Sequence, residues 1–293
     1  MKLIETHIAR VLENPVRFQE YGVGVFKTIP TKSGIKKAIK KKLVFIDGIE
    51  ATTAKYISGG EKISLFQSEV SSVFKRLELP LEVLFEDDYF AIINKPPGIL
   101  VSGNKFMTIA NGLAQNLEKS TLPDAVRPQP VHRLDKATSG VLLIGKTSAA
   151  IRTLSALFLE KKIKKTYFAI AMGAMETSGE IAQTIEGKEA HTTYEVLQKT
   201  PSERFGYLNL IRLQPQTGRK HQLRKHLFGI GNPILGDQNY FNEGFVLKGK
   251  GLYLHAATLS FVHPLTKVTV CITKALPKKF RTIFKNAFIH FEP

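Results

Sequence analysis

From Leu81 onward, short apolar runs separated by turn residues predict a chain built mainly of β-strands. Runs of this length and composition are more typical of strands than of amphipathic helices. The predicted strands cover residues 81–85, 90–93, 140–144, 167–172, 207–213 and 252–261. A helix is predicted after a cap at Thr147 or Ser148, and another from Thr217 to about Phe228. Because these elements show no regular βαβ alternation, we expect an α+β fold.

The first 70 or so residues have a different pattern, which begins with a basic helix. Thr31 can start this helix, and Ile35, Ala38 and Ile39 then fall on one face. The same segment carries lysines at Lys36, Lys37, Lys40, Lys41 and Lys42. These lysines are candidates for phosphate contacts, and the alternative is an ordinary solvated helix face.

Short strands follow this helix. The apolar run 43–46 precedes Asp47-Gly48, a strong signal for a β-hairpin, and residues 63–65 predict another strand. A basic helix beside a small sheet predicts a separate domain at residues 1–72. The larger domain is then expected at 73–293, with a partly helical linker at 68–80.

The balance of charge changes the functional picture. The 293 residues include 42 Lys and Arg against 25 Asp and Glu, which gives a net charge of +17. So basic a surface attracts polyanions, which makes nucleic acid the leading candidate partner and an anionic membrane surface the weaker one. A basic protein without a polyanionic partner is the remaining alternative.

Cysteine content and hydropathy exclude several classes of protein. The single cysteine, Cys271, rules out an internal disulfide framework and argues against a cysteine-based metal site. Residues 1–10 lack the apolar run of a signal peptide, and no stretch approaches the roughly 20 apolar residues of a membrane span. We therefore expect a soluble, cytoplasmic protein.

The first candidate for chemistry is the segment 131–140, Val-His-Arg-Leu-Asp-Lys-Ala-Thr-Ser-Gly. It places Asp135 among His132, Arg133 and Lys136. Nearby cations favour an ionised carboxylate, which can act as a nucleophile. The alternative is a surface ion pair at a turn.

The second candidate is the basic segment 216–227. If it is helical throughout, Arg219 and Lys220 lie in its first turn, where they oppose the helix dipole unless an anion such as phosphate binds there. Leu223 and Leu227 give the helix a buried face, and Arg224 at its border can pair with a buried carboxylate. A solvated basic helix is the alternative.

Two weaker candidates involve apolar and aromatic side chains. Tyr167 follows Lys164 and Lys165 and can stack on a base. Leu254 and its neighbours can form the floor of a base pocket. An aromatic residue in a strand such as Tyr167 usually belongs to the core, and for Leu254 a core position is an equally good explanation.

Residues 140–147 match the phosphate-binding pattern G-x-x-x-x-G-K-[ST] letter for letter. A phosphate-binding loop needs small residues that let backbone amides wrap the phosphates. The interior here is Val-Leu-Leu-Ile, which predicts a buried strand, so we reject nucleotide binding.

The segment 131–140 resembles the signature of the RluA family of pseudouridine synthases, His-Arg-Leu-Asp followed by Thr-Ser-Gly. Further features similar to that family occur in the same order between about Leu81 and Pro264, at residues 86–98, 165–169, 217–224, 232–237 and 254–256. The chain departs from the family pattern at Lys220, usually Thr or Ser, and at Phe241, often Gly. Residues 16–66 also resemble the small αL-type RNA-binding domain first known from a small-subunit ribosomal protein.

The resemblance implies a pseudouridine synthase fold with a mixed, largely antiparallel central sheet, together with the N-terminal αL-type domain. It implies an isomerase that modifies uridines of rRNA or tRNA without a cofactor or metal. Asp135 would be the nucleophile, Arg224 its partner, Tyr167 a stacking residue and Leu254 a packing residue. RNA-contacting residues would be His132, Arg133, Arg219, Lys36, Lys37 and Lys40, with Arg133 entering the space left by the extruded base. We expect a monomer, and the rival hypothesis is a non-catalytic RNA-binding or ribosome-assembly protein.

Overall fold

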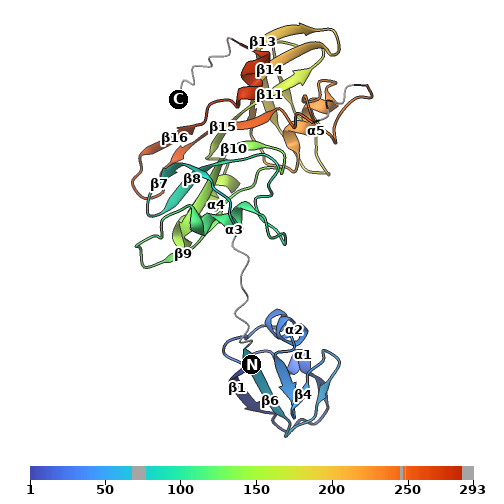
Figure 1. Cartoon of the computed structure of the whole chain (residues 1–293), viewed down its shortest axis with the longest axis vertical. Coiled ribbons are helices and arrows are strands. Elements are labelled where there is room, and N and C mark those ends of the chain that lie inside the picture. Colours follow the sequence, from blue (N-terminus) through green and yellow to red (C-terminus); the bar gives the residue numbers. More distant parts are fainter. Residues whose placement is uncertain (68–76, 245–246, 248, 286–293) are drawn as a thin grey trace. The chain divides into compact units, whose positions relative to one another are not determined.

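The computed structural model describes residues 1–67, 77–244, 247 and 249–285, and the chain divides into two compact units, Met1–Arg76 and Leu77–Pro293 (Figure 1). Most of the linker predicted at 68–80 lies outside the described residues. No helix in the described ranges combines the length and apolar character needed to cross a lipid bilayer. Each unit has a hydrophobic core of its own.

The smaller unit consists of short strands and two helices around a core that includes Phe18, Ile35 and Ile63. Its elements are β1 (Lys2–Ile8), β2 (Val16–Arg17), α1 (Phe18–Tyr21), α2 (Lys32–Lys40), β3 (Val44–Ile46), β4 (Ile49–Glu50), β5 (Tyr56–Ile57) and β6 (Lys62–Gln67). One sheet has the strand order β1-β6-β3-β4, and β2 pairs with β5.

Two local predictions for this unit are confirmed. The Thr31 hydroxyl accepts a hydrogen bond from the backbone N–H of Gly34 at 3.1 Å, so it caps α2 as expected. Asp47 and Gly48 form the turn between β3 and β4 with φ of 49° and 80°, as a two-residue hairpin requires. The lysines Lys36, Lys37 and Lys40 are exposed on α2.

The larger unit is a ten-stranded sheet with helices packed on it. Its elements are β7 (Glu82–Glu86), β8 (Phe90–Lys95), α3 (Ile109–Gly112), the 3-10 helix η1 (Leu113–Gln115), β9 (Ala125–Pro130), β10 (Ser139–Thr147), α4 (Ser148–Leu159), β11 (Lys164–Met172), β12 (Ser178–Ile181), β13 (Thr192–Ser202), β14 (Gly206–Pro215), α5 (Gln222–Gly229), β15 (Leu254–Val262), β16 (Thr269–Thr273) and α6 (Lys278–Ile283). The strand order is β12-β13-β14-β11-β15-β10-β8-β7, with β16 beside β15 and β9 beside β10.

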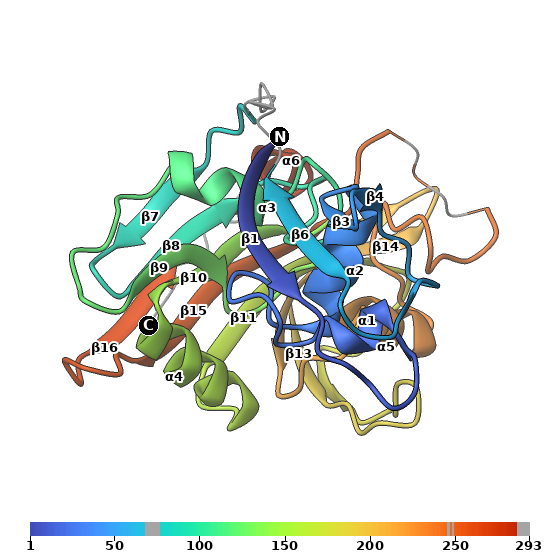
Figure 2. The ribbon, with the colours of Figure 1, turned by 90° about the horizontal axis from the view of Figure 1, so that it is seen from below.

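The pairings confirm an α+β fold with a mixed, largely antiparallel sheet. Among the described strands of this sheet, β10 and β15 pair in parallel and the other pairs are antiparallel. Helix α4 packs beside β10, where Ala150 and Leu154 join a buried cluster with Phe90 and Val141 (Figure 2). Helix α5 buries Leu223 and Leu227 against the other half of the sheet.

Contact between β10 and β15 is brief and depends on a glycine. Ser139 pairs with His255 and Gly140 with Ala256, and beyond these two pairs the strands take other partners. Gly140 has φ of 117°, and a Cβ atom there would lie 2.0 Å from the carbonyl oxygen of Ala256. Only glycine therefore allows this approach. It fixes the start of β10, immediately after the segment that contains Asp135.

The structure corrects one predicted boundary and confirms one rejection. Helix α5 begins at Gln222 and not at Thr217, so Arg219 and Lys220 precede the helix and do not occupy its first turn. Residues 140–147 lie in the fully buried strand β10, and Lys146 donates to Glu86 and to the backbone carbonyl of Asp87, both at 2.6 Å. This segment has the structure of a core strand, as expected, and not that of a phosphate-binding loop.

Candidate active site

Asp135 lies in the segment between β9 and β10 and faces a cleft of about 580 Å³. The cleft is lined by four parts of the larger unit that are distant in sequence, at residues 131–138, 155–167, 215–224 and 254. It brings together Asp135, Tyr167, Arg224 and Leu254, the four residues predicted to bind and attack the base. A second hollow, of about 390 Å³ beside β12–β14, contains none of the predicted site residues.

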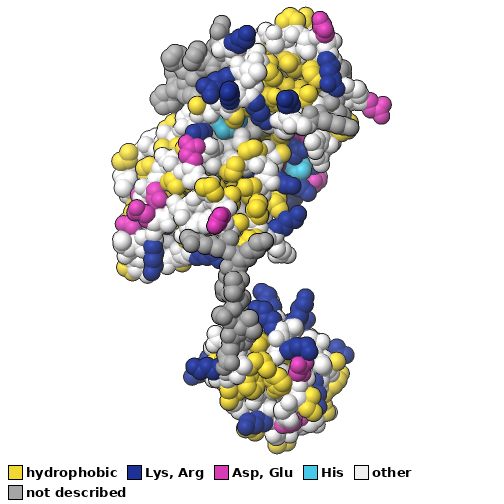
Figure 3. Space-filling view, viewed as in Figure 1, with side chains coloured by type: hydrophobic (Ala, Val, Ile, Leu, Met, Phe, Trp, Pro, Cys, Tyr) yellow, Lys and Arg dark blue, Asp and Glu magenta, His cyan; other side chains and the backbone are white. Residues whose placement is uncertain are grey.

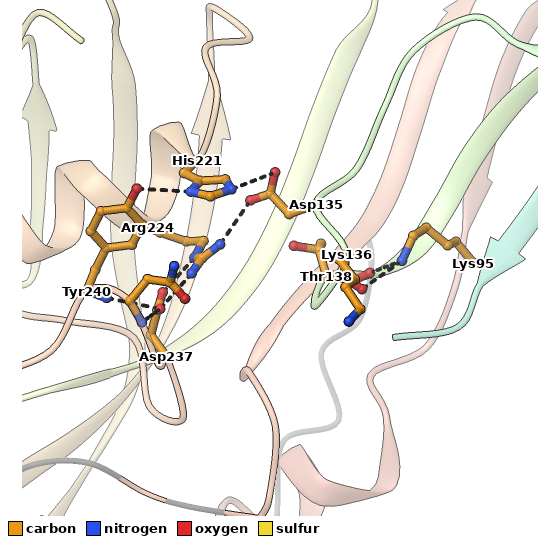
Figure 4. Close-up of polar contacts among 9 residues, drawn as sticks. Lys95, Asp135, Lys136, Thr138, His221, Arg224, Asp237 and Tyr240 are labelled. Atoms are coloured by element: carbon orange, nitrogen blue, oxygen red, sulfur yellow. Dashed lines mark hydrogen bonds and ion pairs between the residues drawn. The ribbon is translucent and has the colours of Figure 1, made fainter. Parts of the chain in front are cut away.

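Two side chains from the α5 region approach the carboxylate of Asp135. Nη1 of Arg224 lies 3.5 Å from Oδ2, and Nε2 of His221 lies 3.8 Å from Oδ1 (Figure 4). The Asp135 side chain is 17% exposed, so it is shielded from bulk solvent and still accessible from the cleft. A partly shielded carboxylate beside a guanidinium is well suited to act as a nucleophile.

The strongest partner of Arg224 is not Asp135 but Asp237. Nε and Nη2 of Arg224 donate to the two oxygens of Asp237 at 2.6 and 2.7 Å, which forms a bidentate pair. The Asp237 side chain is fully buried, and its Oδ1 also accepts backbone N–H bonds from Asn239 and Tyr240. Asp237 therefore fixes the guanidinium plane and leaves Nη1 directed at Asp135.

Lys95 supports the segment that contains Asp135 from the opposite side. This fully buried side chain donates from Nζ to the backbone carbonyls of Pro96, Lys136 and Thr138, at 2.9, 3.2 and 2.7 Å (Figure 4). Two of these acceptors lie within three residues of Asp135. Burial lowers the pKa of Lys95 to about 8, an effect that the nearby Asp135 carboxylate opposes.

Replacing Lys95 by methionine is expected to lower the free energy of unfolding by about 3 kcal/mol or more, because buried carbonyls lose their donor. The native chain releases the Lys95 proton near pH 8, whereas the unfolded chain keeps it up to pH 10.5. The unfolded state thus binds more protons in this window, and wild-type stability rises with pH. Urea denaturation should show the gap between the two proteins widening over this window. Equal urea midpoints throughout would contradict this role, and exposed Lys162→Met is the control.

Tyr167 and Leu254 form the apolar part of the cleft. Leu254 is buried at the start of β15, where it pairs with Ala169 of β11, and Tyr167 of β11 pairs with Ala256 of β15. Burial raises the pKa of the Tyr167 phenol, and the Asp135 carboxylate raises it further. The phenol is therefore neutral over the physiological range, which suits stacking better than unaided base catalysis.

The predicted RNA contacts of the larger unit have different environments. His132 lines the cleft, but its Nε2 accepts the backbone N–H of Leu143 at 3.0 Å, and burial lowers its pKa to about 3. It is consequently a neutral ring that supports the wall. Arg133 is exposed at the cleft, and Arg219 is exposed and anchored by a bond from Nε to the carbonyl of Glu189 at 2.9 Å.

Lysine and arginine side chains are spread over the visible surface of each unit, and acidic ones are fewer (Figure 3). Lys36, Lys37 and Lys40 belong to the small unit and are not among the residues that line the cleft. The seven site residues predicted in the larger unit therefore all line one cleft, and the three lysines lie in the smaller unit. The seven are His132, Arg133, Asp135, Tyr167, Arg219, Arg224 and Leu254.

Four residues of the site were given no role from the sequence: Lys95, His221, Asp237 and Tyr240. Lys95, His221 and Asp237 lie within segments that carry the family resemblance, so their position was a usable signal. The side-chain contacts that define their roles, from Lys95 to Thr138, from His221 to Tyr240 and from Asp237 to Arg224, join residues 13 or more positions apart, so local pattern could not assign them.

Comparisons with known proteins identify the family of this chain. A family model described as RNA pseudouridylate synthase matches residues 89–228. The chain is 31% identical to an uncharacterised RNA pseudouridine synthase of Aquifex aeolicus over 94% of this chain and 97% of that protein. It is 33% identical to ribosomal large subunit pseudouridine synthase D of Buchnera aphidicola over 86% and 88%.

Among solved structures, the human RNA pseudouridylate synthase domain containing 4 matches with a TM-score of 0.55 and 27% identity. The match covers 68% of this chain and 90% of the human one.

Proposed function

The chain belongs to the RNA pseudouridylate synthase family, a family of isomerases, and from this premise we propose that it converts particular uridines of rRNA or tRNA to pseudouridine with Asp135 as the nucleophile. The observation that supports the proposal most is the position of Asp135. Its carboxylate faces the cleft beside Arg224, Tyr167 and Leu254. Large-subunit rRNA is the first candidate substrate, because a relative of similar length is named for it.

The reaction is an isomerisation with no net loss of atoms. The bond between N1 of uracil and C1′ of ribose breaks, the base turns, and a bond forms between C5 and C1′. The proton on C5 leaves, and N1 finally carries a proton. Asp135 assists by adding to the anomeric carbon or to the uracil ring, and the bond that it forms breaks again before the product leaves, which restores the free carboxylate.

The neighbours of Asp135 have separate roles in this proposal. Arg224 favours the ionised carboxylate and, held by Asp237, limits its orientation. Tyr167 stacks on the extruded uracil, and Leu254 packs against it. Extruding the base costs a few kcal/mol, and exposed Arg133 at the cleft enters the space that the base leaves.

Tritium release tests this function against a non-catalytic RNA-binding role. The full-length protein is incubated with transcripts of the source organism's rRNA and tRNA that carry tritium at uracil C5. An isomerase releases tritium to water, because the new glycosidic bond forms at that carbon. A protein that binds these transcripts and releases none would be an RNA-binding protein without the activity.

We further propose that the small unit is an αL-type RNA-binding domain. An exposed row of lysines on α2 beside a small sheet supports this role. Cytoplasmic location, a monomeric state and independence of cofactors stay predictions from the sequence.

Replacing Lys36, Lys37 and Lys40 together by alanine is expected to weaken RNA binding and its dependence on salt. Each lost phosphate contact lowers the slope of log affinity against log salt by about 0.7 to 0.9. The rate on saturating RNA should change little. Dissociation constants measured over a range of salt concentrations provide the check, with exposed Lys119, Lys199 and Lys267 replaced as a control. An unchanged slope would exclude α2 from the RNA interface.

A further inference from the structure

His221 has an unusual backbone conformation next to the proposed nucleophile. It immediately precedes α5 with φ of 56° and ψ of 25°, in the left-handed region that non-glycine residues rarely adopt. This conformation costs on the order of 1 kcal/mol, and such strain is concentrated at functional sites. The surrounding contacts must therefore hold His221 in place.

Both ring nitrogens of His221 face a specific partner. Nδ1 lies 2.9 Å from the phenol oxygen of Tyr240, and Nε2 lies 3.8 Å from Oδ1 of Asp135 (Figure 4). The contact between Nδ1 and the Tyr240 hydroxyl is a hydrogen bond. The distance between Nε2 and Oδ1 lies just beyond hydrogen-bond range, and contacts of this kind commonly tighten when substrate binds.

The charges around the ring determine its tautomer. Desolvation lowers the pKa of His221, with Arg224, Lys220 and Lys225 acting in the same direction and Asp135 opposing, so the ring is neutral at neutral pH. An unprotonated Nε2 would direct its lone pair at the Asp135 carboxylate, which is repulsive. The proton therefore belongs on Nε2, Nδ1 must accept, and the Tyr240 O–H is the donor within reach.

Tyr240 and Asp237 come from one turn. Through them this turn contacts both side chains that flank Asp135, His221 and Arg224. Asp237 holds Arg224 in the bidentate pair, and its Oδ1 accepts the backbone N–H of Tyr240 at 3.2 Å. The Arg224 guanidinium also lies over the Tyr240 ring, 5.0 Å from its centroid. The turn at 237–240 thereby places donors near both oxygens of Asp135.

We propose that His221 is a positioning residue for Asp135: its Nε2–H donates to Oδ1 while Arg224 donates to Oδ2, and the Tyr240 hydroxyl fixes the His221 tautomer. This inference rests on the proposed function. Two donors on different oxygens restrict rotation of the carboxylate and aim it at the extruded uridine. A misplaced reacting group can cost about a hundredfold in rate.

The test measures single-turnover tritium release and RNA dissociation constants for full-length variants on the labelled rRNA and tRNA transcripts. His221→Leu should be slower by about a hundredfold with unchanged RNA affinity. His221→Gln, whose amide can reach the position of Nε2–H, should stay within about tenfold of wild type. Tyr240→Phe should lose about tenfold, roughly one hydrogen bond. In the His221→Leu background Tyr240→Phe should add nothing, since it acts through His221.

His226→Gln is the matched control. His226 lies in α5, five residues after His221, and is buried, but its ring nitrogens contact Thr192 and the carbonyl of Gln183 instead of Asp135. Its variant should keep the wild-type rate.

A wild-type rate in His221→Leu, or equal losses with Leu and Gln, would overturn the inference. A rate for His226→Gln as slow as that of His221→Leu would also overturn it. If His221→Leu does not fold, a wild-type rate in Tyr240→Phe overturns it. Absence of tritium release from wild type itself would reject the proposed function, and with it this inference.

Discussion

Asp135→Asn is expected to abolish isomerisation, lowering single-turnover tritium release by at least about 10⁴-fold, as loss of a nucleophile does in other enzymes. The amide has nearly the same size and keeps its place between His221 and Arg224, but it carries no charge and is a poor nucleophile. RNA affinity should be nearly unchanged, because the cations of the cleft and of α2 remain.

Asp124→Asn provides the matched control for this variant. Asp124 also accepts hydrogen bonds, from Ser148 and from the backbone N–H of Ala149, but it does not line the cleft. Its variant should retain the wild-type rate. Normal turnover by Asp135→Asn would refute the assignment of the nucleophile.

Asp237→Asn is expected to have the largest effect on stability, a loss of about 3–5 kcal/mol in the free energy of unfolding. The Arg224 side chain is 6% exposed, so the substitution leaves a buried guanidinium facing a neutral amide with one acceptor oxygen in place of two. Turnover should fall as well, since Arg224 is no longer held toward Asp135.

Urea denaturation measures the stability loss, and Glu195→Gln is the comparison. Glu195 pairs with Arg212 at the surface, where both side chains are more than 40% exposed. Pairs of this kind contribute about 0–1 kcal/mol. Equal urea midpoints for the two variants would show that the Arg224–Asp237 pair does not stabilise the site.

Local rules predicted elements whose determinants are close in sequence. Thr31 caps α2 by accepting the backbone N–H of Gly34, three residues along the chain. Asp47 and Gly48 form a hairpin turn with positive φ, a conformation that both residue types tolerate. The buried run in β10 outweighed a letter-perfect phosphate-loop pattern, because side-chain size decides whether a backbone can wrap an anion.

Elements stabilised by distant contacts were missed. The long strand β13 (Thr192–Ser202) is partly exposed along most of its length and has a bulge between Val196 and Gln198, so it lacks a clean alternation. The start of α5 is displaced because the Gln222 side chain accepts bonds from Thr217 and from the backbone N–H of Arg219. These bonds stabilise a loop where the sequence predicts a first turn.

In the candidate site, too, the residues recognised from the sequence differ from those whose roles depend on distant contacts. Asp135, Tyr167, Arg224 and Leu254 were predicted through family resemblance and occupy one cleft. Asp237 lies in a segment that carries the resemblance, but it was not assigned a role, because its partner Arg224 is 13 residues away in the chain. Only the folded chain, in which Gly236 approaches the carbonyl of Gly251, buries Asp237 against Arg224.

Mapping pseudouridines in cellular RNA shows whether this chain modifies uridines in the cell and whether Asp135 is required. RNA is compared between the parent strain, a strain lacking this gene, and the deletion strain carrying either the wild-type gene or Asp135→Asn. We expect defined rRNA or tRNA pseudouridines to disappear on deletion, to return with the wild-type gene and to stay absent with Asp135→Asn at equal protein level. Restoration of those pseudouridines by the Asp135→Asn gene would contradict this expectation.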